Sequence, residues 1–277
     1  MSQNLRELLI SKTEEYKDND FVTSLDLQML ACNLLGVDRS KIFSSSLKLD
    51  HKKEDKLIDL IKRRSSGEPL AYILGEKGFW NIDLEVNPKV LVPRPETETI
   101  IEDVLFSFTK ENLNILDLGT GSGAIGLALK KEKPKWEVYC SDISAGALET
   151  TKRNSIRNKA TVHLVLTNWL EAFRKNFFDL IISNPPYIGQ GDKRLDGDGL
   201  SHEPKGALVS GPDGKEDLLN ISSKSLDFLK QGGYLYLEHS PDQSKQMKKS
   251  LENFGYTNII QLRDLNGDLR VIKGCKE

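Results

Sequence analysis

The fold is decided by residues 114–126, which read Asn-Ile-Leu-Asp-Leu-Gly-Thr-Gly-Ser-Gly-Ala-Ile-Gly. The apolar run at 114–118 is typical of a parallel strand that helices cover on both faces. The glycines after it predict a tight turn into a helix, where a ligand can approach the backbone closely and meet free N–H groups. Gly121, Gly123 and Gly126 also have the G-x-G-x-x-G spacing of dinucleotide sites. The loop therefore predicts a nucleoside-containing ligand without identifying it.

Helices and strands alternate around this loop from residue 96 onward. Strands are expected at 114–118, 136–141, 162–166, 178–182 and 234–237, with helices near 123–131, 144–158 and 218–229. The last two strands, 258–263 and 269–272, are joined through Asn266-Gly267, which favours an antiparallel hairpin. We therefore predict an α/β fold with a Rossmann-like parallel sheet and an antiparallel last strand. This arrangement distinguishes methyltransferases that use S-adenosylmethionine from ordinary dinucleotide-binding folds.

The N-terminal part of the chain has a helical pattern as far as about Leu74. Leu27, Leu30 and Leu34 share one helical face, Gly36 follows where that helix should end, and Asp50 can cap the next helix.

Apolar residues then alternate between Gly78 and Val92, around Asn87-Pro88, which predicts a β-hairpin. We expect a small helical domain at 1–75, a hairpin linker at 76–95 and a catalytic domain at 96–277.

The composition is that of a soluble globular protein. Of 277 residues, 38% are hydrophobic and 29% are charged, with 39 Lys and Arg against 41 Asp and Glu, and this near-neutral balance argues against stable binding to nucleic acid. The N-terminus lacks the pattern of a signal peptide, and no apolar run is long enough to cross a bilayer. Cys32, Cys140 and Cys275 follow no metal or disulfide spacing. We expect a cytoplasmic protein without a metal site.

Polar residues after three of the strands predict how a nucleoside is held. Asp142 can accept both ribose hydroxyls, although it can also cap the following helix. Asp117 favours S-adenosylmethionine, because the methionine end of that molecule carries an ammonium and a sulfonium group. Asn168 and Trp169 can hold adenine by its amino group and its face, although a lone Trp is as often a core residue. Asn184 follows the next strand and should lie beside the methyl donor.

The run Ser-Asn-Pro-Pro-Tyr at 183–187 decides the chemistry. Its prolines stiffen an extended turn, so the side-chain carbonyl of Asn184 and the main-chain carbonyl of Pro185 can point rigidly in one direction. Two such acceptors suit a planar –NH₂ group, and their dipoles stabilise the positive charge that develops as nitrogen attacks a methyl group. Tyr187 can stack on a flat amide or base, and Pro186 completes the predicted substrate site. We therefore predict N-methylation of an amide or amino group.

Three further runs carry a resemblance. They are Gly-Glu-Pro-Leu-Ala-Tyr-Ile-Leu-Gly at 67–75, Leu-Val-Pro-Arg-Pro-Glu-Thr-Glu at 91–98, and Glu203-Pro204 with Ala207-Leu208 and Gly-Pro-Asp-Gly at 211–214. With the Asn-Pro-Pro-Tyr motif, they make the sequence similar to the glutamine methyltransferases of peptide chain release factors over most of its length. The resemblance implies S-adenosylmethionine as cofactor, S-adenosylhomocysteine as product, and the Gln of a release factor's Gly-Gly-Gln loop as substrate.

The resemblance also assigns residues. It implies that Gly119, Thr120, Gly121, Ser122 and Gly123 contact the cofactor together with Asp142, Trp169 and Asn184, and that residues 184–187 grip the substrate amide. The helical domain is implied to help dock the release factor. Two positions depart from the family's pattern: Asn168 stands where Asp is common, and His202 where an aromatic is expected. The Gly- and Asp-rich stretch at 189–199 predicts either a mobile lid or an ordinary surface loop.

Four alternatives differ in substrate or class. An adenine or guanine methyltransferase would need a cationic track for nucleic acid, which the balanced charge disfavours. Methylation of a ribosomal-protein glutamine is a closer alternative. A non-catalytic cofactor-binding protein should have lost the glycine loop or the Asn-Pro-Pro-Tyr motif, and both are intact. An NAD-dependent oxidoreductase fits the glycines, but no acid or base for hydride transfer is evident.

Overall fold

The computed structural model describes residues 3–44, 47–197 and 199–277, which form two compact units. The helical unit comprises residues 1–75 and 193–202, and the catalytic unit comprises residues 76–192 and 203–277. Residues 193–202, which lie far from the predicted helical domain in sequence, group with it. Within the described ranges, no helix is both long and apolar enough to span a membrane.

The helical unit is built from short amphipathic helices around one apolar core. Its elements are β1 (Gln3–Asn4), α1 (Leu5–Glu15), α2 (Ser24–Leu35), α3 (Arg39–Ser44), β2 (Lys48–Leu49), α4 (His51–Ser65), α5 (Leu70–Leu74), η2 (Lys193–Asp196) and η3 (Leu200–His202). Leu27, Leu30 and Ile61 are among the buried residues of its core. The predicted helix boundaries are confirmed, because Gly36 ends α2 with a left-handed backbone and Asp50 caps α4 by accepting from the N–H of Lys53.

The catalytic unit contains a seven-stranded sheet in the order β10-β11-β9-β8-β5-β6-β7. Its strands are β5 (Asn114–Leu118), β6 (Glu137–Asp142), β7 (His163–Leu166), β8 (Phe178–Ser183), β9 (Leu229–Glu238), β10 (Thr257–Arg263) and β11 (Leu269–Cys275). Neighbouring strands from β9 to β7 are parallel, whereas β11 runs antiparallel to both β9 and β10. The predicted α/β fold with an antiparallel last strand is confirmed.

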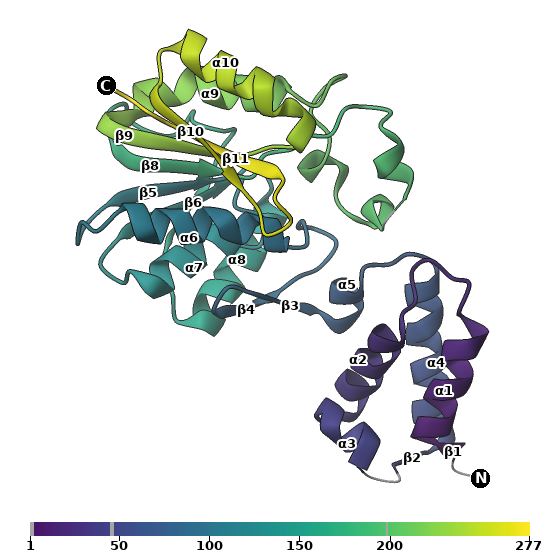
Figure 1. Ribbon diagram of the computed structural model, residues 1–277. Helices are drawn as coiled ribbons and strands as arrows, with labels where there is room; N and C mark the ends of the chain where they lie inside the picture. The colour runs from purple at the N-terminus through teal and green to yellow at the C-terminus, as the bar shows by residue number, and fades with distance from the viewer. Residues whose placement is uncertain (1–2, 45–46, 198) are drawn as a thin grey trace. The chain divides into compact units, whose positions relative to one another are not determined.

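Helices cover both faces of this sheet. The helical elements of the catalytic unit are η1 (Pro95–Thr97), α6 (Glu98–Ser107), α7 (Ala124–Glu132), α8 (Ala145–Asn158), η4 (Lys205–Ala207), α9 (Glu216–Phe228), η5 (Pro241–Gln243) and α10 (Ser244–Phe254). Figure 1 shows α6, α7 and α8 on one face and α9 and α10 on the other. Leu116, Ile181 and Leu235 are therefore fully buried, as the doubly apolar strand sequences require.

The hairpin lies earlier in the chain than its sequence pattern predicted. Strand β3 (Glu76–Phe79) pairs antiparallel with β4 (Ile82–Glu85), so the turn is at Trp80-Asn81 and not at Asn87-Pro88. Trp80 adopts φ 51° in this turn, which is rare for a residue with a side chain. The Trp80 backbone N–H donates to Glu98 Oε1, and its indole N–H donates to Glu132 Oε1. These contacts with α6 and α7, absent from any local sequence signal, stabilise the unusual turn and join the hairpin to the catalytic unit.

Helix α7 packs closely on the sheet because Gly126 has no side chain. A Cβ atom at Gly126 would lie 2.5 Å from Cys140 Sγ and 3.1 Å from Asp117 Oδ2. Both neighbours belong to strands beneath the helix and are themselves buried. A methyl group at this position would therefore push α7 away from β5 and β6.

We expect Gly126→Ala to lower the free energy of unfolding of the catalytic unit by about 1–3 kcal/mol, as overpacked cores do. The matched control is Gly78→Ala on β3, where the nearest atom would be 3.8 Å away and the change should stay within about 0.5 kcal/mol. Urea denaturation followed by tryptophan fluorescence measures this unit alone, because Trp80, Trp136 and Trp169 all lie in it. Equal midpoints and slopes for the two variants would contradict the packing argument.

Candidate active site

A cavity of about 510 Å³ opens at the carboxyl ends of β5, β6, β7 and β8. The predicted site residues that line it are Asp117, Gly119, Thr120, Gly121, Ser122, Asp142, Asn168, Trp169, Asn184, Pro185 and Pro186. Gly123 and Tyr187 do not line it. Parallel strands bring these residues to one edge of the sheet although they are far apart in sequence.

The sequence predicted free N–H groups in the glycine loop, but those of Gly119, Thr120 and Gly121 are bound by the protein itself. The N–H groups of Gly119 and Thr120 both donate to the carbonyl oxygen of Ser141 at 2.9 Å. The N–H of Gly121 donates to Asp142 Oδ2 at 3.0 Å. The loop is therefore pinned to the end of β6, and these donors are satisfied by the protein itself.

Asp117, near the end of β5, is bound to the first turn of α7. Its Oδ2 accepts from the N–H of Gly126, in the first turn of α7, at 2.9 Å, and from Thr120 Oγ1 at 2.5 Å. A helix N-terminus attracts anions, and here the anion is a protein carboxylate. Complete burial raises the pKa of Asp117 to about 6, although both hydrogen bonds favour its ionised form. The beginning of α7 thus disfavours a pyrophosphate and favours a cation.

Asp142 and Trp169, the residues predicted to hold a nucleoside, both line the cavity. Asp142 accepts from Ser144 N–H at 2.8 Å as well as from Gly121, so each carboxylate oxygen keeps acceptor capacity for a hydroxyl. Burial raises the pKa of this carboxyl, and these backbone N–H groups oppose the shift. The Trp169 ring lies 3.4 Å from the position of a Cβ at Gly119, so it flanks the glycine loop. Asn168 Nδ2 donates to Glu171 Oε1 at 2.7 Å, which turns its oxygen away from Glu171.

Asn184 is held by a buried chain of hydrogen bonds. Its Nδ2 donates to Thr97 Oγ1 at 3.2 Å, and Thr97 donates in turn to Glu238 Oε2 at 2.6 Å. Tyr187 donates its hydroxyl to Glu238 Oε1 at 3.1 Å and packs on the apolar core. The Tyr187 hydroxyl is therefore bound by Glu238, and the predicted stacking of the Tyr187 ring on a substrate stays a prediction. No local sequence pattern marks Glu238, because its contacts depend on the pairing of β9 with β8.

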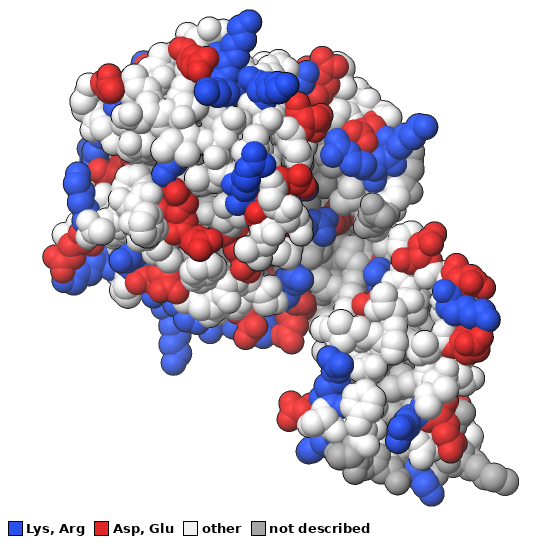
Figure 2. Space-filling view, in the orientation of Figure 1, with Lys and Arg blue, Asp and Glu red and all other residues white. Residues whose placement is uncertain are grey.

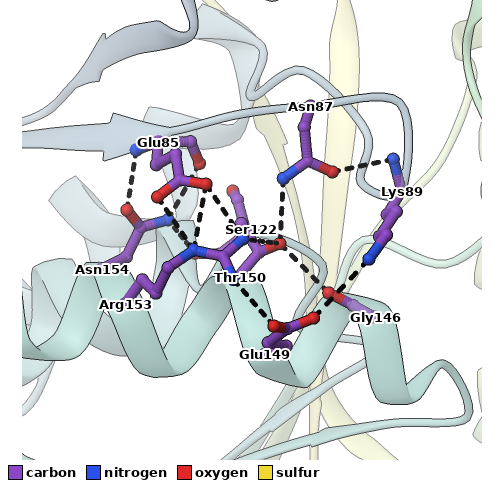
Figure 3. A network of polar contacts seen from close by, with 9 residues as sticks. All are labelled: Glu85, Asn87, Lys89, Ser122, Gly146, Glu149, Thr150, Arg153 and Asn154. Carbon is purple, nitrogen blue, oxygen red and sulfur yellow. Dashed lines mark hydrogen bonds and ion pairs between the residues drawn. The ribbon is translucent and has the colours of Figure 1, made fainter.

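Helix α8 ties the glycine loop to the hairpin (Figure 3). Asn154 Nδ2 donates to the carbonyls of Glu85 at 3.0 Å and of Ser122 at 2.9 Å, and its Oδ1 accepts from the N–H of Glu85 at 2.6 Å. Thr151 Oγ1 donates to the carbonyl of Gly121 at 2.9 Å. The carbonyls of Gly121 and Ser122 are thereby bound by side chains of α8. Asn154 could not be recognised from the sequence, because it stands in an ordinary amphipathic helix pattern.

Glu203 holds two segments of the cavity wall together. This residue is 4% exposed, accepts from the N–H of Val92 at 3.0 Å and forms an ion pair with Arg94. Pro93 lines the cavity on one side of this contact and Pro204 on the other. None of the described residues of 189–199 lines the cavity, and Asp198 lies outside the described residues. The lid role of that stretch stays a prediction.

The comparisons with known proteins agree with this architecture. Residues 101–198 match the methyltransferase small domain, and residues 22–75 match the PrmC N-terminal domain. A release factor glutamine methyltransferase of Coxiella burnetii is 38% identical over 90% of both chains, and one of Aliivibrio fischeri is 36% identical over 98% of this chain and 95% of the relative.

This chain belongs to the release factor glutamine methyltransferase family. A solved methyltransferase from Pyrococcus furiosus shares the fold, with a TM-score of 0.53 at 19% identity over 80% of this chain and 98% of that one. The chain is therefore a methyltransferase whose cofactor is S-adenosylmethionine.

The cavity fits this cofactor better than a dinucleotide. Asp117 and Asp142 place two carboxylates on its wall, and we predict that the first binds the methionine ammonium and the second the ribose hydroxyls. Trp169, with Ile143, which is 73% exposed, offers apolar surface to adenine. Among the described residues, no group of His, Cys, Asp and Glu is arranged to bind a metal ion. The cofactor-binding roles of these residues stay predictions.

We expect binding of S-adenosylmethionine to weaken as the pH falls through about 6. A bound ammonium favours the ionised form of Asp117 and lowers its pKa from about 6, so binding releases a proton. Affinity measured by calorimetry should therefore fall about tenfold between pH 7 and pH 5.

The control compares two Asp→Asn changes. Asp117→Asn should weaken binding and flatten the Asp117 part of this pH dependence, whereas Asp227→Asn, at a surface ion pair on α9, should leave both unchanged. Equal pH dependence in Asp117→Asn and the native protein would show that Asp117 does not meet the ammonium.

Proposed function

We propose that this enzyme transfers a methyl group from S-adenosylmethionine to the side-chain amide nitrogen of the Gln in the Gly-Gly-Gln loop of peptide chain release factors. The observation that supports this substrate is the hydrogen bond from Asn184 Nδ2 to Thr97, which turns the other end of the Asn184 amide, Oδ1, toward an incoming N–H group. Asn184 and Pro185 both line the cavity. Membership of the release factor glutamine methyltransferase family supports a protein glutamine as the substrate that donates this N–H group.

Asn184 and Pro185 position a weak nucleophile. An amide lone pair is delocalised, so the nitrogen reacts only when its orientation is fixed, and Asn184 Oδ1 with the Pro185 carbonyl can accept its two hydrogens. S-adenosylmethionine supplies a methyl group activated by a sulfonium. As the N–C bond forms and the C–S bond breaks, the two carbonyl dipoles stabilise the positive charge on nitrogen. The nitrogen then loses a proton to solvent, which leaves a neutral N-methyl amide and S-adenosylhomocysteine.

The surface charge disfavours a nucleic acid substrate. On the face shown in Figure 2, basic and acidic side chains are interspersed over the catalytic unit and form no continuous basic track. The whole chain carries 39 basic and 41 acidic residues. A base methyltransferase needs a cationic path for the phosphate backbone. The charge distribution therefore supports a protein substrate.

We infer a docking role for the helical unit and a cytoplasmic location. A folded release factor offers more surface than the cavity can contact, and the unit built from residues 1–75 and 193–202 is a separate compact body available for this contact. All three cysteines are free thiols, which suits a reducing compartment. Translation termination takes place in such a compartment.

The test is transfer of a labelled methyl group to purified release factor. We expect label in the intact factor, no label when its Gly-Gly-Gln glutamine is replaced, and none in total RNA, DNA or ribosomal proteins. Asn184→Ala should lower kcat by about 10²- to 10³-fold, because it removes one of two acceptors at the reacting nitrogen.

The matched control is Asn176→Ala, at a residue outside the cavity, which should keep native activity. Label in nucleic acid with none in the factor would contradict the proposal and favour base methylation. Label confined to ribosomal proteins would show that the substrate is a ribosomal-protein glutamine.

A further inference from the structure

The hydroxyl of Thr97 decides which end of the Asn184 amide faces the cavity. A side-chain amide has a donor end and an acceptor end of nearly the same shape, so only its hydrogen-bond partner distinguishes them. Thr97 has one hydroxyl hydrogen, and this hydrogen is donated to Glu238 Oε2 at 2.6 Å. Toward Asn184 the hydroxyl can therefore only accept, and it accepts from Nδ2 at 3.2 Å.

Glu238 sets the direction of the hydrogen bonds that run from Asn184 through Thr97. The residue ends β9, is 1% exposed, and receives hydrogen bonds from Thr97 and Tyr187 on its two oxygens. An ionised carboxylate accepts and cannot donate, so both hydroxyls must point toward it. Burying an ionised carboxylate costs free energy of folding, and the hydrogen bonds from Thr97 and Tyr187 offset part of that cost.

We propose that Thr97 and Glu238 are positioning residues, which fix the Asn184 side chain with its carbonyl oxygen toward the substrate amide. This inference rests on the proposed function and names the groups that orient the substrate in it. Thr97 lines the cavity, whereas Glu238 lies behind it and acts through Thr97. Neither residue abstracts a proton from the substrate.

Protonation of Glu238 reverses the direction of these hydrogen bonds. A protonated Glu238 can donate to Thr97 Oγ1, which frees the Thr97 hydrogen to bind Asn184 Oδ1. The Asn184 amide then turns its Nδ2 toward the substrate, so that an N–H donor of Asn184 faces the N–H donors of the substrate amide. Burial raises the pKa of Glu238 to about 7, against the opposing effects of Thr97, Tyr187 and Arg270, while Glu96 adds to the rise. Arg270 itself pairs with Asp264. We therefore expect kcat to rise as the pH increases through about 7.

Two Thr97 variants test the positioning role. Thr97→Val keeps the shape and removes the hydroxyl, and it should lower kcat about 10- to 100-fold, as the loss of a supporting residue behind a reacting group does. Thr97→Ser keeps the hydroxyl and should restore most of kcat. The matched control, Thr257→Val on the outermost strand β10, should be native-like. Melting temperatures of all variants separate a folding defect from an orientation defect.

The pH profile tests Glu238. Glu238→Gln cannot change charge, so the rise of kcat through about 7 should disappear. An unchanged profile in Glu238→Gln, or native kcat in a folded Thr97→Val, would overturn the inference. These outcomes differ from failure of the proposed function, in which the native enzyme itself transfers no methyl group to release factor.

The orientation of Asn184 can also be measured without substrate, even if the native enzyme transfers no methyl group to release factor. In ¹⁵N-labelled protein, the Asn184 amide signals are those lost in Asn184→Ala. One Nδ2 hydrogen should exchange slowly with water in the native protein and in Thr97→Ser, and quickly in Thr97→Val. Equal exchange in all three proteins would show that Thr97 does not hold Asn184.

Discussion

The hydrogen bonds of Asp117 join the end of β5 to the beginning of α7, and the site is arranged around this joint. One oxygen of the carboxylate accepts from Gly126 in the first helical turn and from Thr120 in the loop. The loop cannot open toward a phosphate without losing these bonds, and a second anion at the same helix end would be repelled. The glycine spacing that binds dinucleotides in other proteins therefore favours a cationic cofactor here.

Three further sets of contacts place the remaining groups around this joint. The Ser141 carbonyl and the Asp142 carboxylate bind the N–H groups of the loop, and Asn154 and Thr151 bind its carbonyls from the other side. Ser183 Oγ donates to the carbonyl of Leu118 at 2.6 Å, which keeps the end of β8 beside the end of β5. Asn184 directly follows β8, so its position in the cavity wall is set by the pairing of β8 with β5 and not by a flexible loop.

Much of this arrangement follows from local sequence signals. The strand and loop at 114–126 and the proline-stiffened turn at 184–187 are defined by residues close in the chain, so both could be predicted. The Trp80-Asn81 turn could not, because Glu98 and Glu132 stabilise it from distant helices. Glu238 and Asn154 were missed for the same reason: each acts through partners that only the strand order and the packing of α8 bring near. The occupied N–H groups of the loop likewise depend on Ser141, a residue of the neighbouring strand.

The most direct test of the central claim is tandem mass spectrometry of a release factor after incubation with this enzyme and S-adenosylmethionine. We expect one added methyl group, on the side-chain nitrogen of the Gly-Gly-Gln glutamine, so that fragment ions gain the mass only from that residue onward. Release of the side-chain amide by acid should then yield methylamine in place of ammonia. A methyl group on another residue, or on an oxygen or carbon atom of the same glutamine, would contradict the amide geometry assigned to Asn184 and Pro185.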